Sequence, residues 1–440
     1  MDITFEAGVA SVCITPPVGV DLTGFGGRPS GCTGIHDDLY AKALVLTDGS
    51  QKVALVTSDL LSLDFDIVAD LRERVAQKLD IPAGHILLSS SHTHSGPTTI
   101  TLRGMGDRDE AYIAVLKRHI VGAIVMADAA RQPVRVGYGK GHVQVGINRR
   151  EWTEKQGTIL GRNPAGPVLP EVDVLRFDSA DGSPFAVFFS HAAHPVVLGR
   201  NNLLISADYP GYTMRFVERN EPVAALFAEG CCGNINADRV GGTFEVARRL
   251  GTMLGAEVVR TLEAITTTGD VHLSVATEVV HLPLIDPPPM EEAKRTFDEH
   301  QAKVKKLVQE GTDEHSLMVP KAYMAWASDM LDLARRGVKG QTQPFEIQAI
   351  ALGDVAIVAL PGEVFVQYAL NIRERSPFPH TLVLGYSNGC IGYVPTAADY
   401  PYGGYEVDTA YQLYGTQMIG PESEEIILEG AMRVLNRVKV

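Results

Sequence analysis

Short apolar runs rich in β-forming residues alternate with helical apolar patterns along most of the chain, and this alternation restricts the fold more than any other feature. Runs 41–48 and 52–59 are separated by a polar turn at Gly49-Ser50, as in two neighbouring antiparallel strands. We therefore expect an α/β protein with mixed β-sheets flanked by helices. The expected strands are 41–48, 52–59, 84–90, 172–178, 185–190, 224–229, 272–283, 345–352 and 355–362, and the expected helices are 66–79, 109–130 and 244–264.

Residues 290–337 carry two charged helical patterns separated by the polar segment EGTDEHS. This arrangement predicts a helical hairpin inserted into the body of the protein. No linker-like run divides the 440 residues, so we expect a single catalytic domain over 1–440. The hairpin could cover a pocket or form a subunit interface. The sequence leaves both roles open, and it leaves homo-oligomerisation open as well.

Composition excludes several classes of function. The formal net charge of −14 argues against nucleic-acid binding and gives no support to stable association with anionic membranes. No stretch approaches the roughly 20 apolar residues of a membrane span. The opening residues MDITFEAGVASV lack the basic start and apolar run of a secretory signal. The five cysteines are an odd number without regular spacing, which does not suggest a disulfide framework. These features predict a cytoplasmic globular protein.

Two pairs of histidines follow two of the expected apolar strands. His92 and His94 lie in SSSHTHSGP, and side chains two apart in an extended segment point to the same face. His191 and His194 lie in FFSHAAHP, where a spacing of three suits neighbouring positions on a turn. Since α/β enzymes assemble their sites at strand ends, the two pairs together suggest a zinc site, although either pair alone is weak evidence.

Other segments contain side chains suited to such a site. Glu363 follows a Pro-Gly turn in LPGEVFV, at the expected start of a helix, where a carboxylate is also favoured by the helix dipole. The run 385–408 holds five tyrosines among glycines and prolines, which is typical of a loop rather than a core. Arg149 or Arg150 in GINRREW could hold a carbonyl or a carboxylate of a substrate.

The loop GCCGNINADRV offers a different chemistry. Cys231 or Cys232 could act as a nucleophile beside a histidine, which would make the protein a metal-independent cysteine hydrolase. Buried, inert cysteines are more common, so we rank this hypothesis below the metal site.

Six segments in a fixed order make the chain resemble the neutral ceramidase superfamily. The resemblance implies a zinc-dependent amidase fold of the kind that acts on N-acyl sphingosine, in a family with many bacterial relatives of unassigned substrate. It spans essentially the whole chain, and the opening GVASVCITPPVGVDLTGFGG is also similar. The segments are SSHTHSGP, INRR, FFSHAAHP, ISADYPGY, LPGE and GYSNGCIGYV.

The resemblance also implies roles for individual residues. One zinc ion is held by two histidines, a glutamate and a tyrosine, which correspond to His92, His191 rather than His194, Glu363 and Tyr393. The substrate pocket contains the second histidine of HTHSGP, an arginine, and a tyrosine 12 positions after the tyrosine ligand. These pocket residues correspond to His94, Arg149 and Tyr405.

The chain departs from the family at one catalytic position. Ceramidases carry GDVSPN, whose serine is assigned as catalytic, whereas this chain reads GNINAD and has Asn236 there. The family's secretory start and C-terminal sandwich domain are also not expected here. These differences argue against ceramide as the substrate, while the implied zinc ligands are all present.

The sequence therefore predicts a zinc-dependent hydrolase that cleaves an amide bond in a small-molecule substrate by metal-activated water. His94, Tyr405, Arg149 and Asn236 are the predicted catalytic residues, and Zn²⁺ is the predicted cofactor. Two alternatives stay open beside the cysteine hydrolase. The same site could cleave an ester or lactone, or the protein could bind zinc or a ligand without catalysis.

Overall fold

The computed structural model describes residues 5–439, and its largest element is a mixed β-sheet of eight strands. Two neighbouring pairs in this sheet are parallel, β10 with β12 and β4 with β5, and the other pairs are antiparallel. In spatial order the strands are β12 (Ala224–Glu229), β10 (Pro184–His191), β9 (Glu171–Ser179), β6 (Gln132–His142), β1 (Glu6–Cys13), β3 (Tyr40–Thr47), β4 (Lys52–Ser58) and β5 (Ile86–Ser90).

A second sheet of four strands packs face to face on the first. It contains β14 (Leu273–Pro283), β15 (Thr342–Leu352), β16 (Val355–Ala359) and β18 (His380–Leu384). Phe188 of the first sheet and Ile357 of the second belong to one buried apolar cluster between the sheets. The strands bury apolar side chains on the face that meets the other sheet. This interface explains the apolar runs in the sequence.

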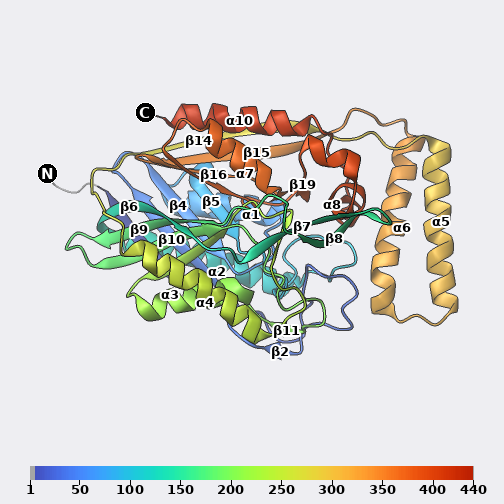
Figure 1. Cartoon of the computed structure of the whole chain (residues 1–440), viewed down its shortest axis with the longest axis horizontal. Helices are drawn as coiled ribbons and strands as arrows, with labels where there is room; N and C mark the ends of the chain where they lie inside the picture. Colours follow the sequence, from blue (N-terminus) through green and yellow to red (C-terminus); the bar gives the residue numbers. More distant parts are fainter. Residues whose placement is uncertain (1–4, 440) are drawn as a thin grey trace.

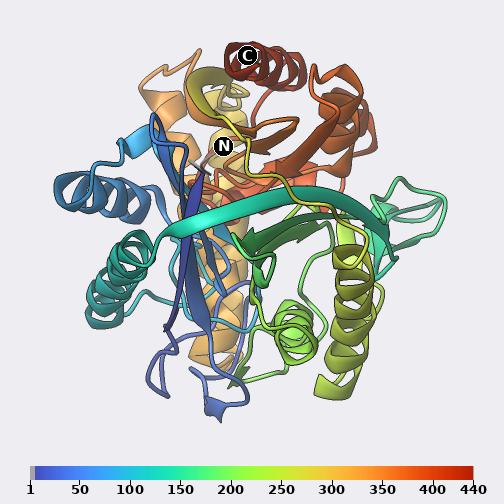
Figure 2. The ribbon, with the colours of Figure 1, turned by 90° about the vertical axis from the view of Figure 1, so that its left-hand side faces the viewer.

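Helices cover the outer faces of both sheets (Figures 1 and 2). The expected helices are confirmed as α1 (Phe65–Lys78), α2 (Glu110–Ala129) and α4 (Phe244–Leu262), and each begins after a capping side chain: Asp64, Asp109 and Thr243. Helix α10 (Ser423–Val438) lies along β14 and β15 (Figure 1). Over the larger sheet, α2 lies on β1 and β3, α4 lies on β6 and β9, and α3 (Asp208–Asn220) lies on β12. Helix α3 was not predicted from the sequence.

The expected helical hairpin is also confirmed. Helices α5 (Met290–Gln309) and α6 (Glu314–Arg335) stand at one end of the molecule, beside the two sheets rather than over them (Figure 1). Helix α6 faces the body, where the Trp326 indole donates a hydrogen bond of 2.8 Å to the Thr416 carbonyl. The hairpin connects β14 to β15, and its two ends meet because Pro283 is the register partner of Thr342.

Short elements fill the space between the sheets and the hairpin. Strands β17 (Glu363–Val364) and β19 (Tyr393–Val394) pair in parallel, and β13 (Ile235–Ala237) pairs with the hairpin of β7 (Gly146–Thr153) and β8 (Gly157–Asn163). Over residues 5–439, we find no helix that combines the length and the apolar character needed to span a bilayer. The remaining elements are β2 (Gly34–Ile35), β11 (Leu204–Ile205), α7 (Val366–Arg375), α8 (Tyr405–Asp408), α9 (Ala410–Leu413) and two 3₁₀ turns at Ala83–His85 and Ala397–Tyr402.

Candidate active site

A cavity of about 910 Å³ opens between the strand ends of the body and the helical hairpin. Its floor contains most of the residues singled out in the sequence, and its walls are largely apolar. Helix α6 contributes Ser316, Val319 and Tyr323, which recur at helical spacing along one face. The hairpin therefore covers the pocket, which is one of the two roles, pocket cover or subunit interface, that the sequence left open.

His92 lies just beyond the end of β5, with a backbone φ of 62° that ends the extended conformation. Its Nδ1 is 2.8 Å from the Leu61 carbonyl oxygen, so this nitrogen carries the proton and donates it. The Nε2 atom consequently holds the lone pair and points into the cavity floor. The sequence predicts an extended HxH segment, but the rings of His92 and His94 converge through the left-handed turn at His92 instead.

His194 is the second histidine of the group at the floor; it is not itself a lining residue but contacts Glu363, which lines the cavity. Its Nδ1 lies 2.7 Å from the Cys232 carbonyl oxygen and 3.0 Å from that of Ile235, so this ring also donates through Nδ1. A β-bridge between His194 and Asn236 fixes the backbone. The side chain is fully buried, and burial, together with the charge of Arg149, lowers the pKa of His194 to about 4. The ring is therefore neutral near pH 7 and presents a free Nε2.

Glu363 completes a three-residue group with these histidines. Its Oε2 is 3.0 Å from His194 Nε2 and 3.5 Å from His92 Nε2, and the Tyr414 hydroxyl donates to its Oε1. Burial alone would raise the pKa of Glu363, but the two adjacent histidines act in the opposite direction and hold it well below its usual range. The expectation of a helix start is corrected: Glu363 lies in the short strand β17, and α7 begins at Val366.

His94 lies beside this group. Its Nε2 is 3.2 Å from His92 Nε2, and His92, His94 and His194 form a cluster whose ligand atoms lie within 4.8 Å of one another. Burial, together with the neighbouring histidines, lowers the pKa of His94 well below its ordinary value. Its buried Nδ1 has no hydrogen-bond partner among residues 5–439, and Gly24 leaves space for the ring, since a Cβ there would come within 2.5 Å of that nitrogen.

The structure does not bring His191 into this group, which corrects the assignment made from the sequence. His191 is the last residue of β10, and its Nδ1 lies 3.0 Å from the Glu171 carbonyl oxygen of the neighbouring strand. Strand pleating puts His191 on the same face as Phe189, which packs in the core. His194 instead follows the end of the strand, and its ring turns to Glu363. The alternation of side chains between the two faces of β10 was the sequence signal that could have distinguished His191 from His194.

Arg149 and Asn236 lie next to one another at the floor, as expected for pocket residues. Arg149 Nε donates to Glu406 at 2.8 Å, and its Nη1 lies 3.2 Å from Asn236 Oδ1 and 3.4 Å from His194 Nε2. The buried Nη2 is without a partner in the described part of the chain. Glu406 also binds Arg150 at 2.7 Å, so one buried carboxylate holds two guanidinium groups. No sequence signal singled out Glu406.

Tyr393 and Tyr405 both line the cavity. Tyr393 is the register partner of Glu363 in the β17–β19 pair, which places the two residues side by side. The Arg149 guanidinium lies 5.2 Å from the centre of the Tyr393 ring, and the Tyr405 ring is 5.6 Å from that of Tyr393. Burial raises the pKa of both phenols, so both are protonated in the protein as described.

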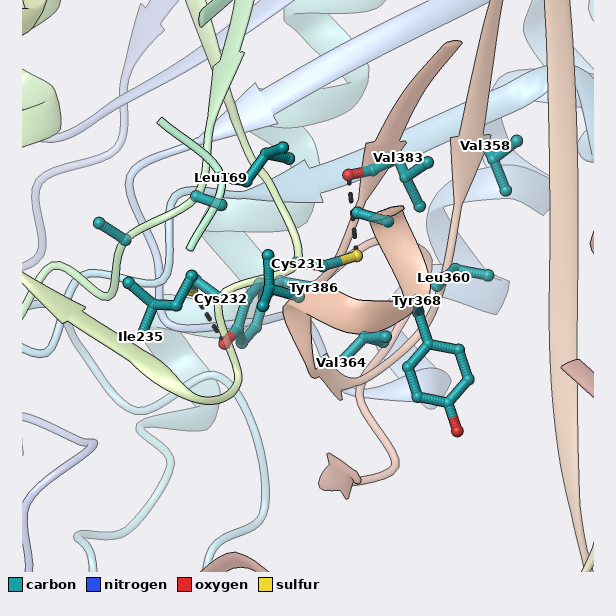
Figure 3. Close-up of a cluster of buried hydrophobic side chains, with 14 of the residues drawn as sticks. Leu169, Cys231, Cys232, Ile235, Val358, Leu360, Val364, Tyr368, Val383 and Tyr386 are labelled. Atoms are coloured by element: carbon teal, nitrogen blue, oxygen red, sulfur yellow. Dashed lines mark hydrogen bonds between the residues drawn. The ribbon is translucent and has the colours of Figure 1, made fainter. Parts of the chain in front are cut away.

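The two neighbouring cysteines lie in the apolar core behind the site (Figure 3). Cys231 Sγ points to the Val383 carbonyl oxygen, and Cys232 Sγ lies 3.2 Å from the Tyr386 hydroxyl and 3.3 Å from His194 Nδ1. Both side chains are fully buried, and burial raises the pKa of Cys231 to about 12 and that of Cys232 well above its ordinary value. Such thiols are not nucleophiles, which argues against a cysteine hydrolase.

A family profile described as neutral/alkaline non-lysosomal ceramidase, N-terminal, matches residues 5–241, more than half of the chain. The chain belongs to this family. Among its relatives, the neutral ceramidase of Pseudomonas aeruginosa is 25% identical over 254 residues, which cover 53% of this chain and 37% of that protein. Neutral ceramidase A of Dictyostelium discoideum is 25% identical over 270 residues, which cover 55% and 37% respectively.

The family fold extends over the whole chain. The crystal structure of neutral ceramidase from Pseudomonas aeruginosa superposes with a TM-score of 0.74 at 18% identity, covering 100% of this chain and 76% of that one. A structure described as ceramidase complexed with C2 gives a TM-score of 0.73, also at 18% identity. By sequence, the match covers only about two fifths of the length of these curated ceramidases, 37% for each of the two relatives named above.

Proposed function

We propose that this ceramidase-family protein is a zinc-dependent hydrolase of amide bonds. One observation carries the proposal. The Nε2 atoms of His92 and His194 converge on Glu363 Oε2 at the floor of a deep cavity, while both Nδ1 atoms are engaged by backbone carbonyl oxygens. Backbone acceptors at Nδ1 are the usual means of orienting histidines that bind a metal through Nε2.

The donor set fits zinc. His92, His194 and Glu363 would supply two nitrogens and an oxygen, and Tyr393, adjacent to Glu363, would supply a second oxygen. His194 takes the place that the resemblance gave to His191. When bound, a zinc ion lowers the pKa of a coordinated water to about 7 and polarises a substrate carbonyl.

The other floor residues supply binding and proton transfer. Arg149 lines the cavity and its Nη2 has no partner in the described chain, so it would be a charged donor for the substrate. The protonated Tyr405 hydroxyl would be a second donor, for the carbonyl oxygen that becomes negative as water adds to the carbonyl carbon. His94 is neutral and has a free ring nitrogen, so it can take up a proton and pass it to the leaving amine. Asn236 has no hydroxyl to form an acyl intermediate, which favours direct attack by water.

The test combines metal content with hydrolysis. The purified protein should contain about one zinc per chain and should hydrolyse N-acyl amides. A chelator should abolish both properties, and added zinc should restore them. Hydrolysis that persists without metal would contradict the proposal, and turnover of matched esters without any turnover of amides would replace the amide by the ester as substrate.

A further inference from the structure

We infer that the pocket selects amides that carry an anionic group, through a cationic rim defined by Arg200 and Arg239. This inference rests on the proposed hydrolase function for the reaction itself. The selection by charge, however, is a property of binding that can be measured separately.

The charge of the pocket is opposite to that of the protein. The whole chain has a formal net charge of −14. The described residues that line the cavity nevertheless include four arginines and only two carboxylates, those of Asp238 and Glu363. An excess of positive charge concentrated in the cavity of an acidic protein attracts anionic ligands and repels cationic ones.

Ion pairs with carboxylates compensate two of the four arginines and leave Arg200 and Arg239 uncompensated. Arg162 binds Asp238 at 2.6 Å, and Arg149 is held by Glu406 from outside the cavity lining. Arg200 and Arg239 are exposed, and Arg200 donates a hydrogen bond of 3.2 Å to the Gly27 carbonyl oxygen. Neither of these two has a carboxylate at ion-pair distance anywhere within residues 5–439.

The two unpaired arginines lie on the same side of the mouth. Arg200 and Arg239 belong to loops that touch, since a Cβ on Gly199 would come within 2.7 Å of Gly241 Cα. A shallower hollow continues from the cavity between these loops and is lined by Arg200 and Val240. Their charges therefore act on one part of a bound substrate rather than on two opposite ends.

A third arginine adds to the positive field beneath this rim. Arg28 is buried and donates to the carbonyl oxygens of Thr23 at 2.8 Å and of His94 at 2.6 Å, and it has no carboxylate at ion-pair distance in the described chain. Its Nε is buried and unpartnered there as well. Burial, together with the charge of Arg200, lowers the pKa of Arg28 to about 10. A nearby anion would offset this uncompensated charge.

The rest of the wall suits an apolar group. Val196, Val319 and Leu413 line the cavity together with Leu102, Met105 and Leu160. An apolar acyl chain against this wall and an anionic group at the rim would place the amide between them. N-acylated acidic amino acids are the class of compound that combines these parts.

The experiment compares two matched soluble substrates, N-octanoylglutamate and its neutral analogue in which both carboxylates are carboxamides. We expect kcat/KM to be about tenfold higher for the anion at low salt and the difference to shrink as salt screens it. Arg200→Gln and Arg239→Gln should each lower the preference about threefold, while Arg200→Lys should keep it. The quantity compared among the variants is the ratio of the two kcat/KM values, in which a general change of activity cancels.

Direct binding separates this inference from the proposed reaction. Calorimetry with the same two compounds measures the charge preference even if neither is hydrolysed. Failure of hydrolysis with preferential binding of the anion would contradict the proposed function alone. Equal binding of the two compounds, or a preference that survives Arg200→Gln combined with Arg239→Gln, would overturn the cationic rim.

Discussion

The floor and the rim of the cavity are built in opposite ways. The floor residues follow the ends of core strands, are buried, and have most of their polar atoms fixed, as the two carbonyl contacts of His194 Nδ1 illustrate. The rim residues Arg200 and Arg239 lie in loops and are exposed, and α6 lines the cavity beside them. Rigid placement suits groups that must meet within a few tenths of an ångström, whereas recognition by charge tolerates motion. The comparison suggests that chemistry and selectivity can be changed independently.

The largest effect should come from removing a floor histidine. His194→Ala should reduce bound zinc from about one per chain to near none and abolish hydrolysis, because it removes an Nε2 ligand. His191→Ala is the matched control, since it deletes an equally buried histidine of the same segment. It should keep zinc and lose only stability, by about 1–3 kcal/mol. Elemental analysis of both variants shows which histidine binds zinc. Zinc loss confined to His191→Ala would restore the ligand assignment made from the sequence.

Arg149→Gln should have the next largest effect. Removing one charged donor from a buried catalytic site lowers the rate by about 10²-fold or more. Zinc content should not change, because Arg149 lies beside the ligand group rather than in it. Steady-state kinetics together with metal analysis measure both quantities. A variant with normal kcat/KM would show that the Arg149 Nη2 does not meet the substrate.

A wall residue should change substrate range without changing the chemistry. Tyr323→Ala enlarges the cavity at α6, so we expect the acyl-chain preference to shift toward longer chains by a few-fold in kcat/KM, the size typical of one or two methylene groups. Arg335→Ala, at an exposed position of the same helix, is the control and should leave the profile unchanged. Identical chain-length profiles for the two variants would mean that α6 does not contact the acyl chain.

The last prediction concerns stability rather than catalysis, through its dependence on pH. Burial lowers the pKa of His191 to about 4, so the unfolded chain binds a proton at this position between roughly pH 6.5 and pH 4 and the folded protein does not. The free energy of unfolding should therefore fall as the pH drops through this range, by at most about 3 kcal/mol from this residue. Urea unfolding of the wild type and of His191→Gln at several pH values measures this change in the free energy of unfolding. If the free energy depends on pH equally in both proteins, the lowered pKa of His191 is contradicted.

The sequence predicted the layers of the fold well and the site only in part. Apolar periodicity located β3, β4 and α1 to within two residues, because burial on one or both faces leaves a local pattern. Glu363 was one candidate and Tyr393 one of five tyrosines in a loop, and only the resemblance selected the two together as ligands. Their contact depends on a two-residue strand pair that no local pattern marks. His194 and Glu406 show the same limit: their roles depend on which distant carbonyl or arginine the fold brings to them.

The junction of the hairpin with the body has an evolutionary consequence. The chain leaves the smaller sheet at Pro283 and returns at its register partner Thr342, so everything between them departs from and rejoins the sheet at adjacent positions. A short turn could close the same gap without disturbing either strand. One contiguous piece of gene could thus be lost, lengthened or exchanged while the floor of the cavity was inherited intact, so that relatives with the same floor could diverge in the molecules that they accept.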